Sequence, residues 1–350
     1  MSSPTQEQLG PWLASRLGWR VDDLVITAPG VGYSSENWQV ASKTDTGIER
    51  IVLRLAARDG VFPTSRLAQE YAVLEYLHPT VVPVAEPLFW CDAQDSPFGR
   101  DVFAMSFVEG WVPTDHPSYA RSGRLFELEP NEQQALQRDL IRHLAMLHSI
   151  SPSPEQWASL GMPATTTATR LPLANLEAFD SVRELALGGR SDEIVDHARR
   201  ILAGQAPREC RPSVVWGDVK VSNVLFGSDN LVRALLDWEM LSIADGVSDL
   251  AFMNVYHEVN TVRRRIPELA GFLDEQRVVE EYEIMSGRPA DNYSYYRLWA
   301  AYRLAILEAR LVAVLEASGR IKATPEIKPA MRFLADEIDA FSGSSGLSIT

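Results

Sequence analysis

Basic residues are scarce in this sequence of 350 residues. Lys and Arg number 33 against 47 Asp and Glu, which gives a formal net charge of −14 and a pI near 5.0. Surfaces that bind nucleic acid depend on clustered Lys and Arg, because these neutralise the phosphate backbone. A broad nucleic-acid surface is therefore not expected. A cationic small molecule would suit the acidic balance, and so would a simple contribution to solubility.

Cysteine and long apolar runs are also in short supply. Cys91 and Cys210 lie in no CxxC motif and in no Cys/His cluster with metal-ligand spacing, so neither a disulfide framework nor a zinc site is predicted. The six histidines form no HExxH motif and are expected on the surface or in the core. No apolar run has the length of a membrane span or of a leader segment. We therefore expect a cytoplasmic protein without a membrane partner.

Apolar periodicity divides the chain into a strand-rich part and a helical part. In the first 107 residues, a short amphipathic helix over 5–18 precedes β-rich runs such as Ile51 to Leu55, which accompany a helical segment over 65–77. Helical periodicity follows over 132–150, 176–187, 193–203, 278–285 and 295–317. We predict an α+β fold with two lobes: residues 1–107 form a small antiparallel sheet with one helix, and residues 108–350 form a larger, mainly helical lobe.

A group of polar residues interrupts the helical part between residues 214 and 239. There the sequence VVWGDVKVSNVLFGSDNLVRALLDWE places Asp218 five residues before Asn223, and Asp237 follows a second apolar run. Phosphoryl transfer needs a carboxylate that orients the attacking hydroxyl, and oxygen ligands that hold Mg²⁺ against the nucleotide phosphates. These residues provide such groups, although a turn rich in Asp and Asn would also explain the spacing.

Further segments accompany this loop in a fixed order along the chain. They are GVGYSSENW (30–38), VLR (52–54), QEY (69–71), MSFVEG (105–110), LH (147–148) and ADGVSDLA (244–251). Together with the loop, they resemble the aminoglycoside phosphotransferase and choline kinase superfamily, in particular the kinase-like domains related to those fused to acyl-CoA dehydrogenases. The resemblance covers most of the chain.

The resemblance implies a two-lobed, protein-kinase-like fold that binds ATP in the cleft between its lobes. Asp218 would be the catalytic base, with Asn223 and Asp237 as Mg²⁺ ligands. Arg54, paired with Glu70, would hold the nucleotide phosphates. The remaining nucleotide contacts would come from the glycine-rich hairpin and the hinge, namely Gly30, Gly32, Ser34, Ser35, Ser106 and Val108.

Some residues of the loop differ from the family pattern or extend it. Trp216 stands where the aminoglycoside enzymes usually have histidine, at a position expected to serve packing and loop orientation. Arg54 replaces the lysine of better-known kinases and keeps the positive charge. Lys220 completes the D-x-K-x-x-N spacing of protein-kinase catalytic loops, and would neutralise charge on the transferring phosphoryl group unless it is only a solvated lysine.

Other residues near the expected cleft have structural explanations. Asp245 and Asp249 are expected to brace loops rather than to contact substrate. The aromatic cluster between Tyr293 and Tyr302 has mostly helical spacing, which favours core packing over a role as a wall of the acceptor site.

The predicted function is transfer of the γ-phosphate of ATP, with Mg²⁺, to a hydroxyl of a small molecule that the sequence does not identify. One alternative is a nucleotide-binding pseudokinase that acts as a scaffold. Another is an antibiotic-resistance enzyme, which would require a strongly acidic acceptor pocket. The sequence predicts no oligomeric state.

Overall fold

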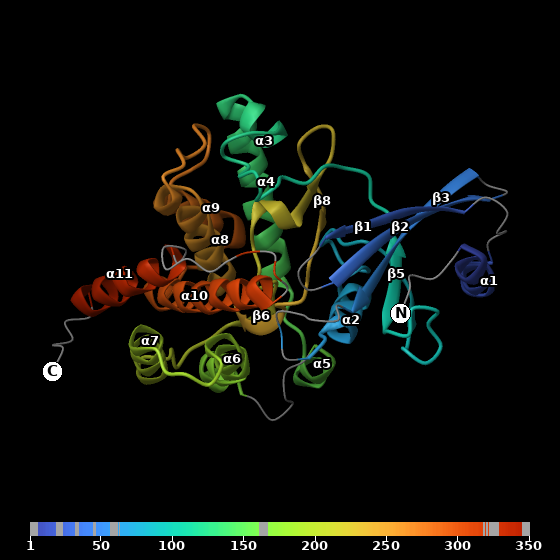
Figure 1. Cartoon of the computed structure of the whole chain (residues 1–350). Coiled ribbons are helices and arrows are strands. Elements are labelled where there is room, and N and C mark those ends of the chain that lie inside the picture. Colours follow the sequence, from blue (N-terminus) through green and yellow to red (C-terminus); the bar gives the residue numbers. More distant parts are fainter. Residues whose placement is uncertain are drawn as a thin grey trace. The chain divides into compact units, whose positions relative to one another are not determined.

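The computed structural model forms two compact units, Met1–Glu109 and Gly110–Thr350. It describes residues 6–18, 24–31, 35–44, 47–56, 62, 64–160, 167–317, 319, 321 and 329–344. The first unit consists mainly of strands and the second mainly of helices (Figure 1). The predicted mixture of a small antiparallel sheet and a larger helical part is confirmed.

A five-stranded antiparallel sheet forms the first unit, with the strand order β1-β2-β3-β5-β4. The strands are Val25–Val31 (β1), Ser35–Thr44 (β2), Gly47–Ala56 (β3), Pro87–Cys91 (β4) and Val102–Ser106 (β5). Two helices accompany the sheet, Gln6–Leu17 (α1) and Leu67–Leu77 (α2).

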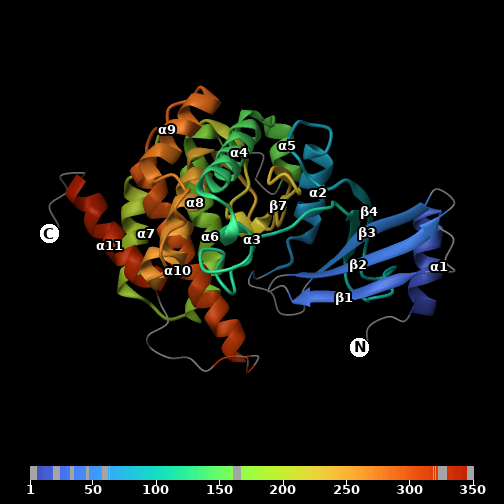
Figure 2. The same ribbon diagram turned by 90° about the horizontal axis from the view of Figure 1, so that it is seen from above.

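Alternation along β3 determines which side chains face each helix. Ile51, Leu53 and Leu55 are buried in one cluster with residues of α1. Arg54 points to the other face, as the period of two residues in a strand requires. There it meets Glu70 of α2. The two helices accordingly lie on opposite sides of the sheet (Figure 2).

The second unit contains helices of varied length and two small two-stranded sheets. The helices are Arg124–Glu127 (α3), Pro130–Ser149 (α4), Pro154–Ser159 (α5), Leu171–Leu187 (α6), Glu193–Gly204 (α7), Val247–Asn260 (α8), Glu275–Ser286 (α9), Tyr293–Ala317 (α10) and Pro329–Ser344 (α11). One sheet pairs Pro212–Val215 (β6) with Ser242–Asp245 (β9), and the other pairs Val224–Phe226 (β7) with Val232–Leu235 (β8).

Helix α10 lies at the centre of the second unit, in contact with α6, α7, α8 and α11. A helix that is apolar on all sides must be covered on all sides. Its residues Tyr295, Tyr296, Trp299 and Tyr302 are all at most 8% exposed, and Trp299 stacks on Tyr302. These aromatic residues therefore belong to the core, the explanation that their helical spacing favoured.

Four helices lie where none was predicted from the sequence, namely the short α3 and α5 and the longer α8 and α11. α8 begins within the segment 244–251, which was interpreted only as a family motif. α11 extends to Ser344, into a tail rich in Gly and Ser, which have low helix propensity. The tail residues 341–344 are helical because Phe333 and Leu334, earlier in the same helix, are fully buried and fix it to the core.

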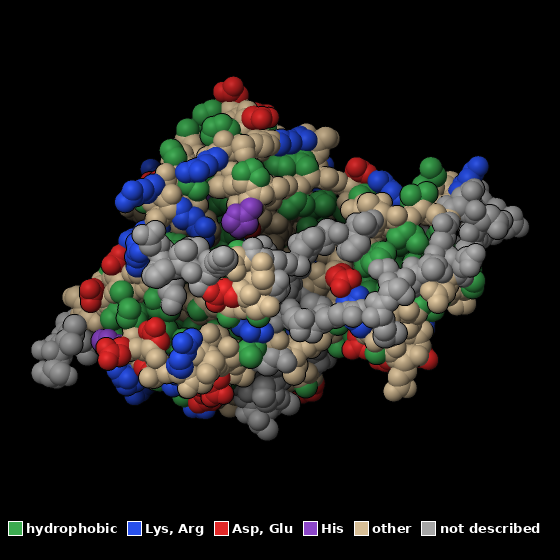
Figure 3. All heavy atoms as spheres, in the orientation of Figure 1, with side chains coloured by type: hydrophobic (Ala, Val, Ile, Leu, Met, Phe, Trp, Pro, Cys, Tyr) green, Lys and Arg blue, Asp and Glu red, His purple; other side chains and the backbone are tan. Residues whose placement is uncertain are grey.

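The exposed side chains show no large patch of one charge on the face drawn in Figure 3, where acidic and basic groups are interspersed. The excess of carboxylates is thus not gathered on this face. Among the described residues, none of the helices combines the length and the apolar character that crossing a membrane requires.

Candidate active site

The loop that carries Asp218 connects β6 with a 3₁₀ turn, Val221–Asn223. Its conformation depends on Gly217, which has a φ of +89°. A Cβ atom at this position would lie 2.1 Å from the backbone oxygen of Met240. Only glycine fits there, because any other residue would meet both a strained backbone and a clash. The backbone therefore turns sharply just before Asp218.

The carboxylate of Asp249 holds the loop in this conformation. Its Oδ2 accepts a hydrogen bond from the backbone N–H of Trp216 at 2.7 Å, and its Oδ1 accepts one from the N–H of Gly217 at 2.7 Å. Asp249 lies in the first turn of α8 and is fully buried. The expected role of Asp249 as a brace is thus seen in its contacts.

A histidine completes the hydrogen bonding of this buried carboxylate. Nε2 of His148, at the end of α4, lies 3.1 Å from Asp249 Oδ2, and Nδ1 lies 2.8 Å from the hydroxyl of Tyr282. Because an ionised carboxylate only accepts hydrogen bonds, Nε2 carries the proton. In the neutral ring, Nδ1 then accepts from Tyr282. Burial, and then the charges of Asp245 and Asp249, raise the pKa of Tyr282, so its hydroxyl remains a donor.

Trp216 and Arg303 support the same turn from two other directions. Trp216 is fully buried, and its indole N–H donates to the backbone oxygen of Leu236 at 2.8 Å. The guanidinium of Arg303, on α10, donates to the backbone oxygen of Gly217 at 2.7 Å. The packing role expected for Trp216 agrees with these contacts, whereas the sequence analysis did not identify Arg303.

Asp218, Lys220 and Asn223 lie in contact at the end of this loop. The ammonium of Lys220 is 3.0 Å from Asp218 Oδ2. The side-chain amide of Asn223 donates to the same Oδ2 at 2.8 Å and to the backbone oxygen of Asp218 at 3.0 Å. Neither bond uses the amide oxygen of Asn223, which is the atom suited to bind a hard cation.

Lys220 is surrounded by negative charge. Burial alone would lower its pKa. The carboxylates of Asp218, Asp115 and Asp237 outweigh that effect and raise the pKa of Lys220, so its side chain stays protonated. The ammonium also lies 5.4 Å from the ring centre of Tyr256. These contacts do not fit a merely solvated lysine.

Asp237 follows β8 and adopts a left-handed backbone, with a φ of +61°. Asp and Asn tolerate this region better than most residues. Its backbone oxygen accepts a hydrogen bond from the indole N–H of Trp216 at 3.2 Å, which places Asp237 beside the Asp218 loop. The charge of Asp237 contributes to the raised pKa of Lys220. The structure thus brings together the four polar residues that the sequence analysis singled out in the second unit.

The residues predicted to bind the nucleotide lie in the first unit. The ion pair between Arg54 and Glu70 is formed, with 2.7 Å between Nε and Oε2, and both residues are buried. A second, longer contact joins Arg54 Nη1 to Asn37 Oδ1 at 3.5 Å. The pair holds Arg54 in a fixed direction, while its contact with phosphates remains a prediction.

The hairpin and hinge residues are described only in part. Gly30 pairs with Asn37 across β1 and β2, and Ser35 begins β2 and is buried. Ser106 ends β5 and its hydroxyl accepts the N–H of Glu86 at 2.9 Å, and Val108 follows two residues later. Gly32 and Ser34 lie outside the described residues.

Asp115 and Tyr256 were not identified from the sequence. Asp115 accepts a hydrogen bond from the hydroxyl of Ser222 at 2.8 Å, across 107 positions of sequence. Burial raises the pKa of Tyr256 well above its usual value, and the charges of Asp115 and Asp218 add to this effect. Tyr256 lies seven residues after Asp249, on the same side of a helix, so recognising α8 would have revealed it.

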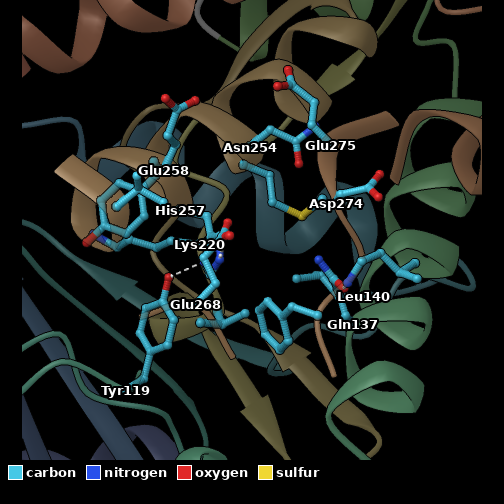
Figure 4. Close-up of a pocket in the computed structure, with 16 residues that line it drawn as sticks. Tyr119, Gln137, Leu140, Lys220, Asn254, His257, Glu258, Glu268, Asp274 and Glu275 are labelled. Carbon is cyan, nitrogen blue, oxygen red and sulfur yellow. Dashed lines mark hydrogen bonds and ion pairs between the residues drawn. The ribbon is translucent and has the colours of Figure 1, made fainter. Parts of the chain in front are cut away.

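A pocket adjoins Lys220 in the second unit, with a volume of about 200 Å³ (Figure 4). His257 of α8 forms part of its wall, and its Nδ1 lies 2.9 Å from the hydroxyl of Tyr119. The ring stacks against Tyr119 and lies 5.3 Å from that of Phe272. Burial lowers the pKa of His257 to about 4, and the charge of Glu258 offsets this only in part.

A strand-rich unit, a helical unit and a loop that joins Asp218, Lys220 and Asn223 are typical of one class of protein, the phosphotransferases with a kinase-like fold. Comparison with known proteins supports it: residues 25–287 match the phosphotransferase enzyme family, and the chain belongs to that family. This confirms the resemblance seen in the sequence. Membership assigns the chain to the phosphotransferases whose acceptor is an alcohol group.

Known proteins resemble the chain at low sequence identity. Mouse acyl-CoA dehydrogenase family member 10 is 24% identical over 271 residues, which cover 74% of this chain and 24% of that protein. A candidate aminoglycoside phosphotransferase from Ralstonia eutropha has a TM-score of 0.71 and 19% identity, over 99% of this chain and 100% of that one.

A further solved structure is a thermostable mutant of the aminoglycoside phosphotransferase APH(4)-Ia in complex with AMP-PNP and hygromycin B. It has a TM-score of 0.58 and 14% identity, over 97% of this chain and 99% of that one. Among the curated relatives, by contrast, the chain spans only a quarter to a third of the length of the proteins it matches.

Asp249→Asn should unfold more easily than the unmodified protein. The two oxygens of Asp249 accept the backbone N–H groups of Trp216 and Gly217. An amide has only one acceptor oxygen, so one of these buried N–H groups loses its partner. We expect a loss of about 2–4 kcal/mol in the free energy of unfolding, measured by urea denaturation. Asp229→Asn, at an exposed site, serves as the control. Equal stability of both variants would contradict the assigned role.

His257 should make the protein sensitive to acid. Its pKa of about 4 in the folded state lies below the usual value of 6.5, so the unfolded chain binds the proton first as the pH falls. Stability is therefore lost between pH 6.5 and about 4, by about 3 kcal/mol in total. His257→Asn should lose less over this range. The free energy of unfolding of both proteins is measured by urea denaturation at several pH values. If it falls equally with pH in the variant and in the unmodified protein, His257 is not the cause.

Proposed function

We propose that this chain transfers the γ-phosphoryl group of ATP to a hydroxyl group of a small molecule, with Mg²⁺ as the required cation. The observation that carries the proposal is the contact between Asp218, Lys220 and Asn223 within a loop that Asp249 fixes. A similar phosphotransferase is described with AMP-PNP bound, which supports ATP as the donor.

Asp218 is suited to act on the acceptor. Its Oδ2 is engaged by Lys220 and Asn223, and these contacts fix the direction of the carboxylate. Lys220 and Val221 of the same loop line the adjoining pocket. An acceptor hydroxyl at that end of the pocket would meet the carboxylate, which orients it and takes its proton. Lys220 contributes a fixed positive charge where negative charge develops in the transition state.

The donor groups around Lys220 fit Mg²⁺. Among the described residues, no three His, Cys, Asp or Glu side chains form a metal cluster. Mg²⁺ does not need one, because it usually takes one or two protein ligands and completes its octahedron with phosphate oxygens and water. Asp237 and the amide oxygen of Asn223 supply such ligands. The bound cation would neutralise charge on the transferring phosphates.

In the first unit, Arg54 would bind the nucleotide phosphates. Glu70 neutralises part of its charge and contacts Nε at 2.7 Å, and Asn37 contacts Nη1 at 3.5 Å. The two contacts hold the guanidinium in one orientation. A guanidinium can bind phosphate oxygens through two parallel hydrogen bonds.

Asp218→Asn should abolish most of the transfer while leaving the fold and the nucleotide affinity nearly unchanged. The variant keeps the size of the side chain but cannot accept the proton of the acceptor, so we expect turnover to fall by about 10²-fold or more. An acceptor is first found by following ADP formation over alcohols, amino sugars, choline-like amines and hydroxyacyl thioesters. Unchanged transfer to that acceptor would remove Asp218 from the mechanism.

Asp237→Asn should remove the effect of Mg²⁺ on nucleotide binding, because a carboxylate ligand is lost. Asn is preferred to Ala here since it also tolerates the left-handed backbone of residue 237. Titrations of ATP with and without Mg²⁺ measure the effect, and Asp229→Asn controls for the loss of one charge. If the Asp237 variant keeps the full Mg²⁺ dependence, the cation is held elsewhere.

A further inference from the structure

The pocket beside Lys220 has a mainly apolar lining. Its walls come from α4, α8, the 3₁₀ turn after Lys220, and the segment before α9. The apolar part is formed by Leu140, Val221, Met253, Val262, Phe272 and Leu273. At about 200 Å³ the pocket is larger than the cavity of about 150 Å³ that accepts benzene in another protein. It therefore has room for a skeleton of about six carbon atoms.

The carboxylates in the inner wall are already engaged. Glu258 and Glu275 both pair with Arg297, at 2.7 and 2.5 Å, and Glu275 also accepts the hydroxyl of Tyr293 at 2.6 Å. In Figure 4 the carboxylates of both residues turn away from the centre of the pocket. Arg297 also pairs with Glu337 at 3.0 Å, so it holds the two pocket carboxylates away from a ligand without cancelling all of their charge.

The other two carboxylates lie at exposed positions. The side chain of Glu268 is 61% exposed, and Asp274 is exposed and accepts the backbone N–H of Arg277 at the start of α9. An exposed ion pair strengthens binding by at most about fivefold, because water and salt screen it. Each methylene group that leaves water for an apolar wall strengthens binding by about fourfold. Several methylene groups therefore outweigh one exposed charge.

Among the described residues that line it, the end of the pocket near the catalytic loop offers a cation no free carboxylate. Lys220 forms an ion pair with Asp218 at 3.0 Å, and the ring of His257 is neutral near pH 7. An ammonium group placed deep in the pocket would lose its hydration among the apolar side chains, and this loss opposes its binding.

We propose that this pocket takes the uncharged, largely apolar carbon skeleton of the acceptor alcohol, with the hydroxyl directed toward Asp218 and Lys220. The inference rests on the proposed function and specifies the substrate class of the same site. It differs from an acidic pocket for a polycationic acceptor, because the inner carboxylates are held by Arg297.

The test compares neutral and cationic alcohols of matched length. Binding of 1-propanol, 1-butanol, 1-pentanol and 1-hexanol to the full chain is measured by ligand-observed NMR without nucleotide. Affinity should rise by about threefold to fourfold per methylene. 1-Hexanol should bind at least about tenfold more tightly than 6-amino-1-hexanol, since the ammonium cannot be buried without cost. Equal or tighter binding of the amino alcohol would overturn the proposal.

A pair of variants locates the binding site. Val262 lines the pocket and is 47% exposed, so Val262→Trp can fill the space without disturbing the core. Ile284 on α9 is 77% exposed and does not line the pocket, which makes Ile284→Trp the matched control. Affinity for 1-hexanol should fall at least about tenfold in the first variant only, since the added ring would displace several buried methylene groups. The same affinity in both variants would overturn the assignment of this pocket.

ATP with Mg²⁺ is then added to separate this inference from the proposed function. Neutral alcohols that bind as described but are never phosphorylated support the pocket assignment and contradict phosphotransfer. Transfer to amino alcohols, with no binding or transfer of the neutral ones, supports phosphotransfer and overturns the apolar acceptor.

Discussion

The geometry of the candidate active site depends on one buried carboxylate, that of Asp249. Removing a carboxylate from water is costly unless hydrogen bonds replace its hydration. The backbone N–H groups of Trp216 and Gly217 and the ring of His148 provide that replacement. The same bonds fix the turn before Asp218. One set of contacts therefore stabilises the buried charge and sets the direction of the proposed base.

This arrangement makes a local loop depend on distant helices. Asp249 lies on α8, His148 on α4, and Arg303 on α10, which packs against α8. Each helix is held by its own apolar contacts. Because the turn at Gly217 is hydrogen-bonded to residues of these helices, its position is fixed as well. A catalytic group gains precision when rigid elements support its neighbours. The large helical unit thus serves to position a few atoms of one loop.

The sequence predicted what is encoded locally and missed what is assembled from distant positions. Asp218, Lys220 and Asn223 lie within six residues, so their spacing alone indicated their proximity. The pairing of Arg54 with Glu70 followed from a family pattern and from the alternation in β3. Asp115 gave no such signal, because its partner Ser222 lies 107 positions away.

The missed helices and Arg303 have physical explanations of the same kind. α8 was not predicted because its first turn lies within the segment 244–251, which was interpreted only as a family motif. α11 was missed because its end is rich in Gly and Ser, and buried residues earlier in the helix outweigh that low propensity. Arg303 lies in an apolar helix, where a sequence pattern cannot show that its guanidinium bonds the oxygen of Gly217.

Charge counted from the sequence is a poor guide to the charge that a ligand meets. The chain has 14 more acidic than basic residues, and four carboxylates line the pocket beside Lys220. Such a count favours a cationic ligand. The contacts change that conclusion, since Arg297 holds Glu258 and Glu275. What remains at the inner end is the ion pair of Lys220 with Asp218, a neutral histidine and apolar side chains. The electrostatic character of a site is therefore set by which charges lack protein partners, and only the three-dimensional contacts reveal these.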